Sequence, residues 1–483
     1  MGPLWQEALS APGDRSPLGD TPRPTRETMH SALLLSAFAL LSPQDVPTRG
    51  LEGEALPAGQ SLAAVLGGGH SDFGGPSVRV NELLGQGVYS LTMEATGTDW
   101  EESFLVGVPA NPIDPAPLLV TFHQYSASER DTYLHTDLFS EAMDRGWYVL
   151  APLGAHQVNC GVAYAQENIR VVIDWLGEVV RLDPTRIYGI GFSMGGGNAL
   201  NFAARNQDPD RVMFAAVVNH TGTVSIRDVW HRAQDTSILA HPLMFGGSPY
   251  QNPFEYAQAS TIEMTPFSGI DERTDLARNL GHVPVQTWCT PGDPLQHLVR
   301  QTRALLRHLL RFGGEIDPNE ERGSRHTWDT LDEIAALDFL ADQRLALPTT
   351  GTHSMLALHD GRWLHFDLEQ AKSGAFSSWR WYCDARSNLL FLDGLCNIVE
   401  LRVRTQDLGL APTETLRLIL GRQQGRTARS EHTTRLVLTG YDAAPRTVLR
   451  EGRPAPFTWN PERGELSIEE RDAANLPLWV IVP

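Results

Sequence analysis

Ser193 lies between Gly191 and Gly195 in the segment RIYGIGFSMGGGNAL (residues 186–200). A β-rich apolar run leads into this G-x-S-x-G pattern, and small residues typical of a helix start lead out of it. Such a strand–turn–helix arrangement holds the serine on a sharp turn, where glycines let the two backbones pass close together. The free N–H groups of the helix start favour negative charge beside the hydroxyl. The segment therefore predicts that Ser193 is a nucleophile.

A serine hydroxyl needs a base that takes its proton, and the base needs an acid that orients it. His326 follows a glycine-containing loop in ERGSRHTW and precedes the last helical pattern of this region. Asp293 ends a strand pattern in VQTWCTPGDPL, 100 residues after Ser193 and 33 before His326. The order serine, acid, histidine predicts His326 as the general base and Asp293 as its acid. Asp271 and Asp275 are weaker alternatives, because no strand pattern leads into them.

An oxyanion that forms on the substrate needs backbone N–H groups that face it. One is expected from Met194, the residue after the nucleophile, and the other from the loop that reads HQYSA after the strand pattern at 118–123. Within that loop we predict Tyr125 as the donor. Tyr125, Phe192 and Trp328 are also the predicted substrate-binding residues.

These residues need a scaffold, and the pattern from residue 87 onward supplies one. Short apolar runs bounded by Pro, Gly and Asp alternate with helical periodicity at residues 169–180 and 299–312. Strands that alternate with helices predict a mostly parallel, doubly wound sheet covered on both faces. The predicted strands are 87–94, 103–108, 118–123, 148–152, 187–191, 214–219 and 285–290.

After residue 347 the helical periodicity disappears, and short alternating runs predict an all-β, sandwich-like domain. The predicted strands there are 363–366, 398–403, 416–419, 434–439 and 478–482. The predicted organisation is a signal peptide and lead-in (1–45), a linker or N-terminal arm (46–80), a catalytic domain (81–347) and the β domain (348–483). We expect residues 87–347 to be able to fold alone.

The composition is that of a globular protein, with 41% apolar and 20% charged residues. A net charge of −19 argues against nucleic acid and anionic membranes as partners. Residues 32–41 (ALLLSAFALL) are too short to span a bilayer but fit the apolar core of a signal peptide, so we expect a secreted or periplasmic protein without membrane insertion.

The four cysteines show neither C-x-x-C nor metal-ligand spacing, so neither a metal nor a cofactor is expected. In an exported protein, Cys383 and Cys396 are spaced to bridge a local hairpin, although four cysteines allow three pairings.

Residues 87–347 resemble the α/β-hydrolase superfamily in the nucleophile turn and the order of the triad. GFSMGGG (191–197) and QYSA (124–127) are similar to cutinase-type polyester hydrolases, which pair a Tyr and a Met amide in the oxyanion hole. FGGSPYQNPFEY (245–256) resembles prolyl-oligopeptidase and dienelactone-hydrolase relatives, and polyhydroxybutyrate depolymerases are a further neighbour. The chain departs from the pattern where His123-Gln124 replaces the usual His-Gly, and where Asn219-His220 offers no match for the tryptophan of the polyester hydrolases.

Three functions compete. The leading one is hydrolysis of carboxylic esters, small or polymeric, including polyester or polysaccharide-linked esters. The second is a serine peptidase of prolyl-oligopeptidase type, in which Glu129, Arg130 or Asp131 would clamp a peptide terminus. The third is a binding protein, in which tryptophans of the C-terminal domain form an exposed row that stacks on sugar or polymer, although such tryptophans are more often core. The five tryptophans in question are Trp363, Trp379, Trp381, Trp459 and Trp479.

Overall fold

The computed structural model describes residues 78–94, 96–232, 240–265, 269–270, 272–422, 433–470 and 476–483. The expected signal peptide at 32–41 and the alternative acid Asp271 lie outside these residues. Within them, none of the helices is both long and apolar enough to cross a membrane.

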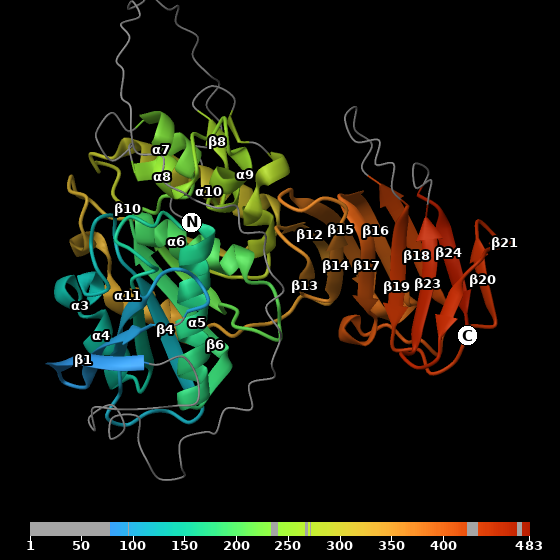
Figure 1. The fold of residues 1–483 in the computed structure, drawn as a ribbon, viewed down its shortest axis with the longest axis horizontal. Coiled ribbons are helices and arrows are strands. Elements are labelled where there is room, and N and C mark those ends of the chain that lie inside the picture. Colours follow the sequence, from blue (N-terminus) through green and yellow to red (C-terminus); the bar gives the residue numbers. More distant parts are fainter. Residues whose placement is uncertain are drawn as a thin grey trace, which may run out of the picture. The chain divides into compact units, whose positions relative to one another are not determined.

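A nine-stranded sheet is the centre of the N-terminal part of the described chain (Figure 1). Six neighbouring strands pair in parallel, and three more join one edge by antiparallel pairing. In spatial order the strands are β1 (Val78–Gly85), β2 (Val88–Met93), β3 (Glu102–Gly107), β5 (Tyr148–Pro152), β4 (Ala116–Phe122), β6 (Leu182–Phe192), β7 (Ala216–His220), β10 (Val285–Cys289) and β11 (Ile316–Glu320).

Helices cover both faces of this sheet, because successive residues of a buried strand point to opposite faces. These helices are α4 (Leu138–Asp144), α5 (Ala163–Val179), α6 (Met194–Arg205), α10 (Gln296–Arg311) and α11 (Glu333–Ala341). Leu118 and Val120 of β4 share a hydrophobic cluster with α5, α6 and α10, whereas Leu119 packs with α4 and α11. A doubly wound sheet with a serine turn after its β6 strand is the α/β-hydrolase fold, as predicted.

Two strands of the sheet were missed by the sequence patterns. β11 reads IDPNE, and an edge strand tolerates such polar residues and a proline because one of its sides has no strand partner. β1 begins at Val78, so residues 78–80, assigned to the N-terminal arm, already belong to the sheet. Pro184 lies inside β6, which begins at Leu182, shortly after α5 ends at Val179.

The segment between β7 and β10 builds a group of short elements. They are α7 (Ile226–Arg232), α8 (Ala240–Met244), α9 (Pro253–Gln258), β8 (Met264–Thr265), β9 (Gly269–Ile270) and the 3₁₀ turns η2 (Glu272–Thr274) and η3 (Leu276–Leu280).

The C-terminal part is all-β, as predicted, and its two sheets pack face to face. The rings of Phe366 and Trp379, which come from different sheets, lie 5.7 Å apart. One sheet has the order β12 (Gly351–Ala357), β15 (Ser377–Asp384), β16 (Leu389–Cys396), β18 (Leu416–Arg422), β24 (Leu478–Val482), β20 (Thr447–Arg450) and β21 (Arg453–Pro454). The other has the order β13 (Gly361–Trp363), β14 (Phe366–Gln370), β17 (Ile398–Arg404), β19 (Thr434–Thr439), β23 (Glu465–Glu470) and β22 (Thr458–Asn460).

Two expectations for this part were wrong. Residues 363–366 are the turn between β13 and β14 and not a strand, because Leu364 takes a positive φ of 52° that ends the extended chain. All four cysteines are free. Cys383 pairs with Leu390 and Cys396 with Ser378, so the two thiols lie at opposite ends of the β15–β16 hairpin and cannot bridge it.

Asn279 of η3 joins the two parts of the chain. It is fully buried, and its amide donates to the carbonyl groups of Ala204 and Leu356, both at 2.9 Å. Its carbonyl oxygen accepts the N–H of Leu356 at 2.8 Å. One side chain therefore fastens β12 to the C-terminal end of α6, the helix that begins directly after Ser193.

Candidate active site

Ser193 connects β6 to α6 in a backbone conformation that few residues adopt. Its φ is 56° and its ψ is −119°, a region populated almost only by glycine and found for other residues mainly where function requires it. The N–H of Ser193 donates to the carbonyl of His220 at 2.9 Å, which ties the turn to β7. The side chain is thereby held at the carboxyl edge of the sheet.

The glycines around the serine are required by close backbone contacts. A Cβ added to Gly191 would lie 2.3 Å from the backbone of Gly195, and one added to Gly195 would lie 2.1 Å from the carbonyl oxygen of Phe122. Both distances are far below van der Waals contact, so only glycine fits. The second contact also brings the end of β4, where the HQYSA loop begins, directly against the serine turn.

The structure brings the three predicted triad residues together. His326 Nε2 lies 2.8 Å from Ser193 Oγ, and His326 Nδ1 lies 2.7 Å from Asp293 Oδ2. The other carboxylate oxygen of Asp293 accepts the N–H of Leu295 at 2.7 Å, which fixes the carboxylate plane. Asp293 is 1% exposed and Ser193 is 7% exposed. This is a continuous hydrogen-bonded relay from a buried carboxylate to a serine hydroxyl.

Aromatic rings support the imidazole of His326. The centroid of the Phe192 ring lies 4.4 Å from that of His326, 4.7 Å from that of His220 and 5.3 Å from that of Trp328. Phe192 is fully buried and Trp328 is 3% exposed, so neither of these two predicted substrate-binding residues presents a surface to a ligand. Phe192 packs directly against the imidazole of His326, and Trp328 packs against Phe192.

His220 was not assigned a role from the sequence. It is fully buried, and its Nε2 lies 2.8 Å from Thr330 Oγ1 in the segment just after His326. Burial, and secondarily the positive charge that His326 can carry, lower the pKa of His220 to about 3. His220 therefore stays neutral and adds no competing charge next to the base.

The two predicted oxyanion donors, Met194 and Tyr125, belong to neighbouring segments. Met194 is the first residue of α6, and the first N–H groups of a helix have no partner within it. Its sulfur accepts the N–H of Cys160 at 3.3 Å. Tyr125 is half-buried and packs against a small apolar cluster that contains Met194, so the tyrosine and methionine segments are neighbours.

The loop between β5 and α5 supports both segments. His123 Nε2 lies 2.8 Å from the carbonyl of Leu153, and Ser126 donates its N–H to the carbonyl of Gln157 at 2.9 Å. Glu102 holds the start of this loop, because its carboxylate accepts the N–H groups of Gly154 and Ala155 at 2.7 Å each. Burial raises the pKa of Glu102 to about 7, and those hydrogen bonds oppose the rise.

The alternative acid and the proposed peptide clamp are engaged elsewhere. Asp275 is fully buried and bonds to His308 and to the N–H of Ala277. Arg130 pairs with Glu82 at 2.8 Å and lies 3.7 Å from Glu129. Asp131 is 4% exposed and accepts hydrogen bonds from Gln124 and Trp328. Within the described residues, no group of His, Cys, Asp and Glu side chains is arranged to hold a metal ion.

Sequence reasoning assigned no role to His220 and a different one, that of a peptide clamp, to Asp131. Both are polar residues that the fold buries, and a sequence gives no direct sign of burial. The run Glu129-Arg130-Asp131 was interpreted from charge alone, whereas an aspartate that opens the short helix α3 (Asp131–His135) beside the oxyanion loop is a usable signal.

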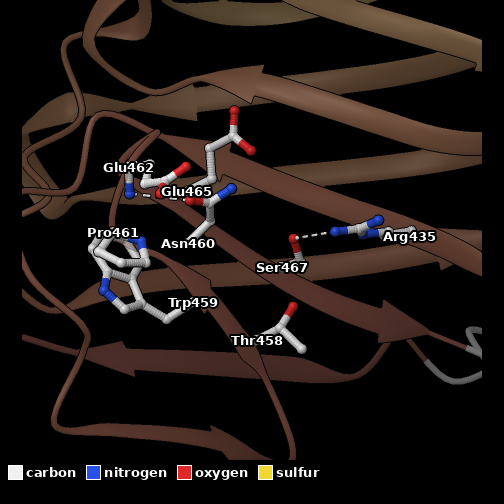
Figure 2. Close-up of a pocket in the computed structure, with 8 residues that line it drawn as sticks. All are labelled: Arg435, Thr458, Trp459, Asn460, Pro461, Glu462, Glu465 and Ser467. Atoms are coloured by element: carbon white, nitrogen blue, oxygen red, sulfur yellow. Dashed lines mark hydrogen bonds between the residues drawn. The ribbon is translucent and has the colours of Figure 1, made fainter.

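A surface pocket of about 530 Å³ belongs to the C-terminal part and contains none of the triad residues (Figure 2). Polar and apolar atoms both line it, and among its residues Arg435 donates to Ser467 at 3.1 Å. Trp459 is half-buried there, whereas the other four tryptophans of the expected row are at most 2% exposed. The exposed aromatic row is therefore absent from the described residues. The lining residues are Arg435, Thr458, Trp459, Asn460, Pro461, Glu462, Glu465 and Ser467.

No family model matches the chain, and no curated protein matches it in sequence. Among solved structures, it is similar to fluorophosphonate-binding serine hydrolase F of Staphylococcus aureus, with 14% identity and a TM-score of 0.42 over 53% of this chain and 98% of that one. An S-formylglutathione hydrolase of Agrobacterium tumefaciens gives 12% identity and a TM-score of 0.41 over 55% and 98%. For dipeptidyl peptidase 4 of Porphyromonas gingivalis the identity is 15% and the TM-score 0.38, and the match covers 55% of this chain and 42% of that one. With TM-scores below 0.5, these likenesses identify no substrate.

Proposed function

We propose that this α/β-hydrolase cleaves carboxylic esters through an acyl-enzyme intermediate. The observation that carries the proposal is the relay from Asp293 through His326 to Ser193, at 2.7 and 2.8 Å, on a serine whose strained turn opens a helix. A nucleophile, an oriented base and nearby backbone N–H groups are the parts that acyl transfer needs.

The reaction proceeds in two steps, acylation of Ser193 and hydrolysis of the acyl-enzyme. Ser193 Oγ attacks the ester carbonyl while His326 takes the hydroxyl proton, and the oxyanion is bound by the N–H groups of Met194 and Tyr125. The tetrahedral intermediate collapses, the bond from carbon to the alcohol oxygen breaks, and His326 returns the proton to the leaving alcohol. Water then attacks the acyl-serine with the same base, which releases the acid and regenerates Ser193. Asp293 keeps the Nδ1 proton on the imidazole throughout.

The preference for an ester over a peptide is supported by the charges beside the oxyanion loop. A peptidase that holds a substrate's amino terminus needs an acidic side chain facing the site. Asp131 is instead buried under neutral N–H donors, and Arg130 is paired with Glu82. No cofactor enters the mechanism.

We also propose that the protein is exported, on the apolar run at residues 32–41, and that neither nucleic acid nor anionic membrane is a partner, on the net charge of −19. An exported esterase with this site would meet small or polymeric esters outside the cytoplasm.

The test is a substrate panel run on the wild type and on Ser193→Ala: short- and long-chain p-nitrophenyl esters, a dipeptidyl anilide and a polyester film. We expect ester hydrolysis that Ser193→Ala abolishes, and covalent labelling of Ser193 by a fluorophosphonate. A higher kcat/KM for the anilide than for every ester would replace the esterase by a peptidase. Ester turnover that survives in Ser193→Ala would remove the proposed nucleophile.

A further inference from the structure

Asp131 is joined to the loop that carries the Tyr125 amide. Its Oδ2 accepts the backbone N–H of Gln124 at 3.1 Å, and its Oδ1 accepts the side-chain amide of the same residue at 3.0 Å. The carbonyl of Gln124 is held as well, because His123 Nδ1 lies 2.8 Å from it and Ala127 donates its N–H to it at 3.1 Å. The backbone of Gln124, the residue that precedes Tyr125, is therefore held at both its N–H and its carbonyl.

The same carboxylate is joined to the segment that carries the base. Asp131 Oδ2 also accepts the indole N–H of Trp328 at 3.1 Å. Trp328 lies two residues after His326, and its ring packs on Phe192, which in turn packs on His326. One buried carboxylate thus connects the oxyanion loop to Trp328, which lies 197 residues after Asp131 in the chain.

We propose that Asp131 is a positioning residue that holds the oxyanion loop and the His326 segment in a fixed position relative to each other. The inference rests on the proposed function, and it adds to that function a residue that touches neither the substrate nor the triad. In this loop, His123-Gln124 stands where His-Gly is more usual. Asp131 binds the side chain of Gln124 and so holds the loop in one conformation despite that side chain.

The physical reason is the free-energy cost of leaving a buried N–H donor without an acceptor. The three groups that hydrogen-bond to Asp131 are neutral N–H donors, and His135 Nε2 lies further away, 4.0 Å from Oδ1. In Asp131→Asn, the side chain keeps its size but turns an N–H₂ group toward at least one of these donors. The loop must then shift, and small displacements of oxyanion donors are costly for catalysis because their alignment with the developing charge is lost.

The experiment compares Asp131→Asn, Trp328→Phe and the double variant with Asp137→Asn, an exposed aspartate on the same segment that serves as the control for lost charge. We measure kcat and KM on a soluble p-nitrophenyl ester, the rate of Ser193 labelling by a fluorophosphonate, and the melting temperature. Asp131→Asn should lower kcat and the labelling rate together by roughly 10- to 100-fold with little change in KM, less than the 10²–10³-fold cost of a lost oxyanion donor. The losses of the two single variants should not add in the double variant, because they remove the same link.

The outcomes separate this inference from the function on which it rests. If Asp131→Asn lowers only the melting temperature, or keeps the kcat of Asp137→Asn, the residue is merely structural and the inference fails. Fully additive losses with Trp328→Phe would also overturn it. If the wild type cleaves no ester and Ser193 is not labelled, the proposed function itself has failed.

Discussion

The ring of Phe192 lies against the imidazole of His326, with centroids 4.4 Å apart and planes inclined by 38°. Phe192 directly precedes the nucleophile in the chain, so the residue that ends β6 supports the base that acts on its own neighbour. Its side chain points to the face of the sheet covered by α4 and α11, whereas Ser193 stands at the sheet edge.

Phe192→Leu should therefore impair catalysis as well as stability. Leucine keeps the apolar contact but removes the flat support, so we expect kcat to fall roughly tenfold with little change in KM, since small displacements of a base are costly. Phe104→Leu is the matched control, because Phe104 is also fully buried in the sheet but packs on Trp175. Both variants should lose about 1–2 kcal/mol of stability. Equal kcat values in the two variants would contradict the supporting role of Phe192.

Asp293→Asn should leave the fold intact and remove most activity. An amide that donates toward Nδ1 favours the wrong imidazole tautomer, and in the serine-protease template this costs about 10⁴-fold in kcat. Asp275→Asn provides a close control, because Asp275 is likewise buried and likewise bonded to a histidine, His308. It should lower the melting temperature without comparable loss of kcat. A larger loss of kcat in Asp275→Asn would move the acid away from Asp293.

Glu102 should make the protein less stable as the pH rises toward neutrality. Burial raises its pKa in the folded protein from the ordinary 4.5 to about 7, so the folded state holds a proton that the unfolded chain has released. The stability that the protonated carboxyl contributes is complete below pH 4.5 and is lost as the pH rises through 7, by about 3 kcal/mol. Melting curves between pH 4.5 and 8 should show a flatter pH dependence for Glu102→Gln. Burial also raises the pKa of Glu333 to about 7, so this residue contributes to the same pH dependence. The melting curves of Glu333→Gln are therefore measured as well, to separate the two contributions.

Removal of the β domain should damage the catalytic part. The sequence predicted that residues 87–347 form an independent unit, but a chain ending at Leu347 leaves Asn279 without its two bonds to Leu356. We expect this truncation to melt lower than the full chain and to lose hydrolysis of a soluble ester. Asn279→Ala in the full chain should reproduce part of the loss of stability. A truncation with unchanged melting temperature and turnover would show that the chain up to Leu347 folds and works without the β domain.

The sequence was informative wherever local chemistry dictates structure. The Gly191-x-Ser193-x-Gly195 turn is recognisable because a Cβ at either glycine would lie 2.1–2.3 Å from backbone atoms, so only glycine fits. The parallel strands are recognisable because burial on both faces makes them continuously apolar. Asp293 and His326 could be placed because each follows a strand or loop at the edge of the same sheet.

What the sequence could not reveal depends on side chains from distant segments. Phe192 looked like a pocket residue because it neighbours the serine, yet the alternation of β6 turns it into the core. Asp131 was considered only as a clamp for a peptide terminus, and only the folded chain brings Trp328 to it. β11 carries too few apolar residues to show any periodicity.

The strained backbone conformation of Ser193 affects how this position can evolve. A non-glycine residue at φ 56° and ψ −119° costs on the order of 1–3 kcal/mol, out of a net stability of typically 5–15 kcal/mol for a folded domain. Glycine at this position would relieve that strain, because it has no Cβ. A descendant released from selection for catalysis would therefore gain stability from Ser193→Gly, and a serine retained here in homologous chains would indicate that selection for the reaction still operates.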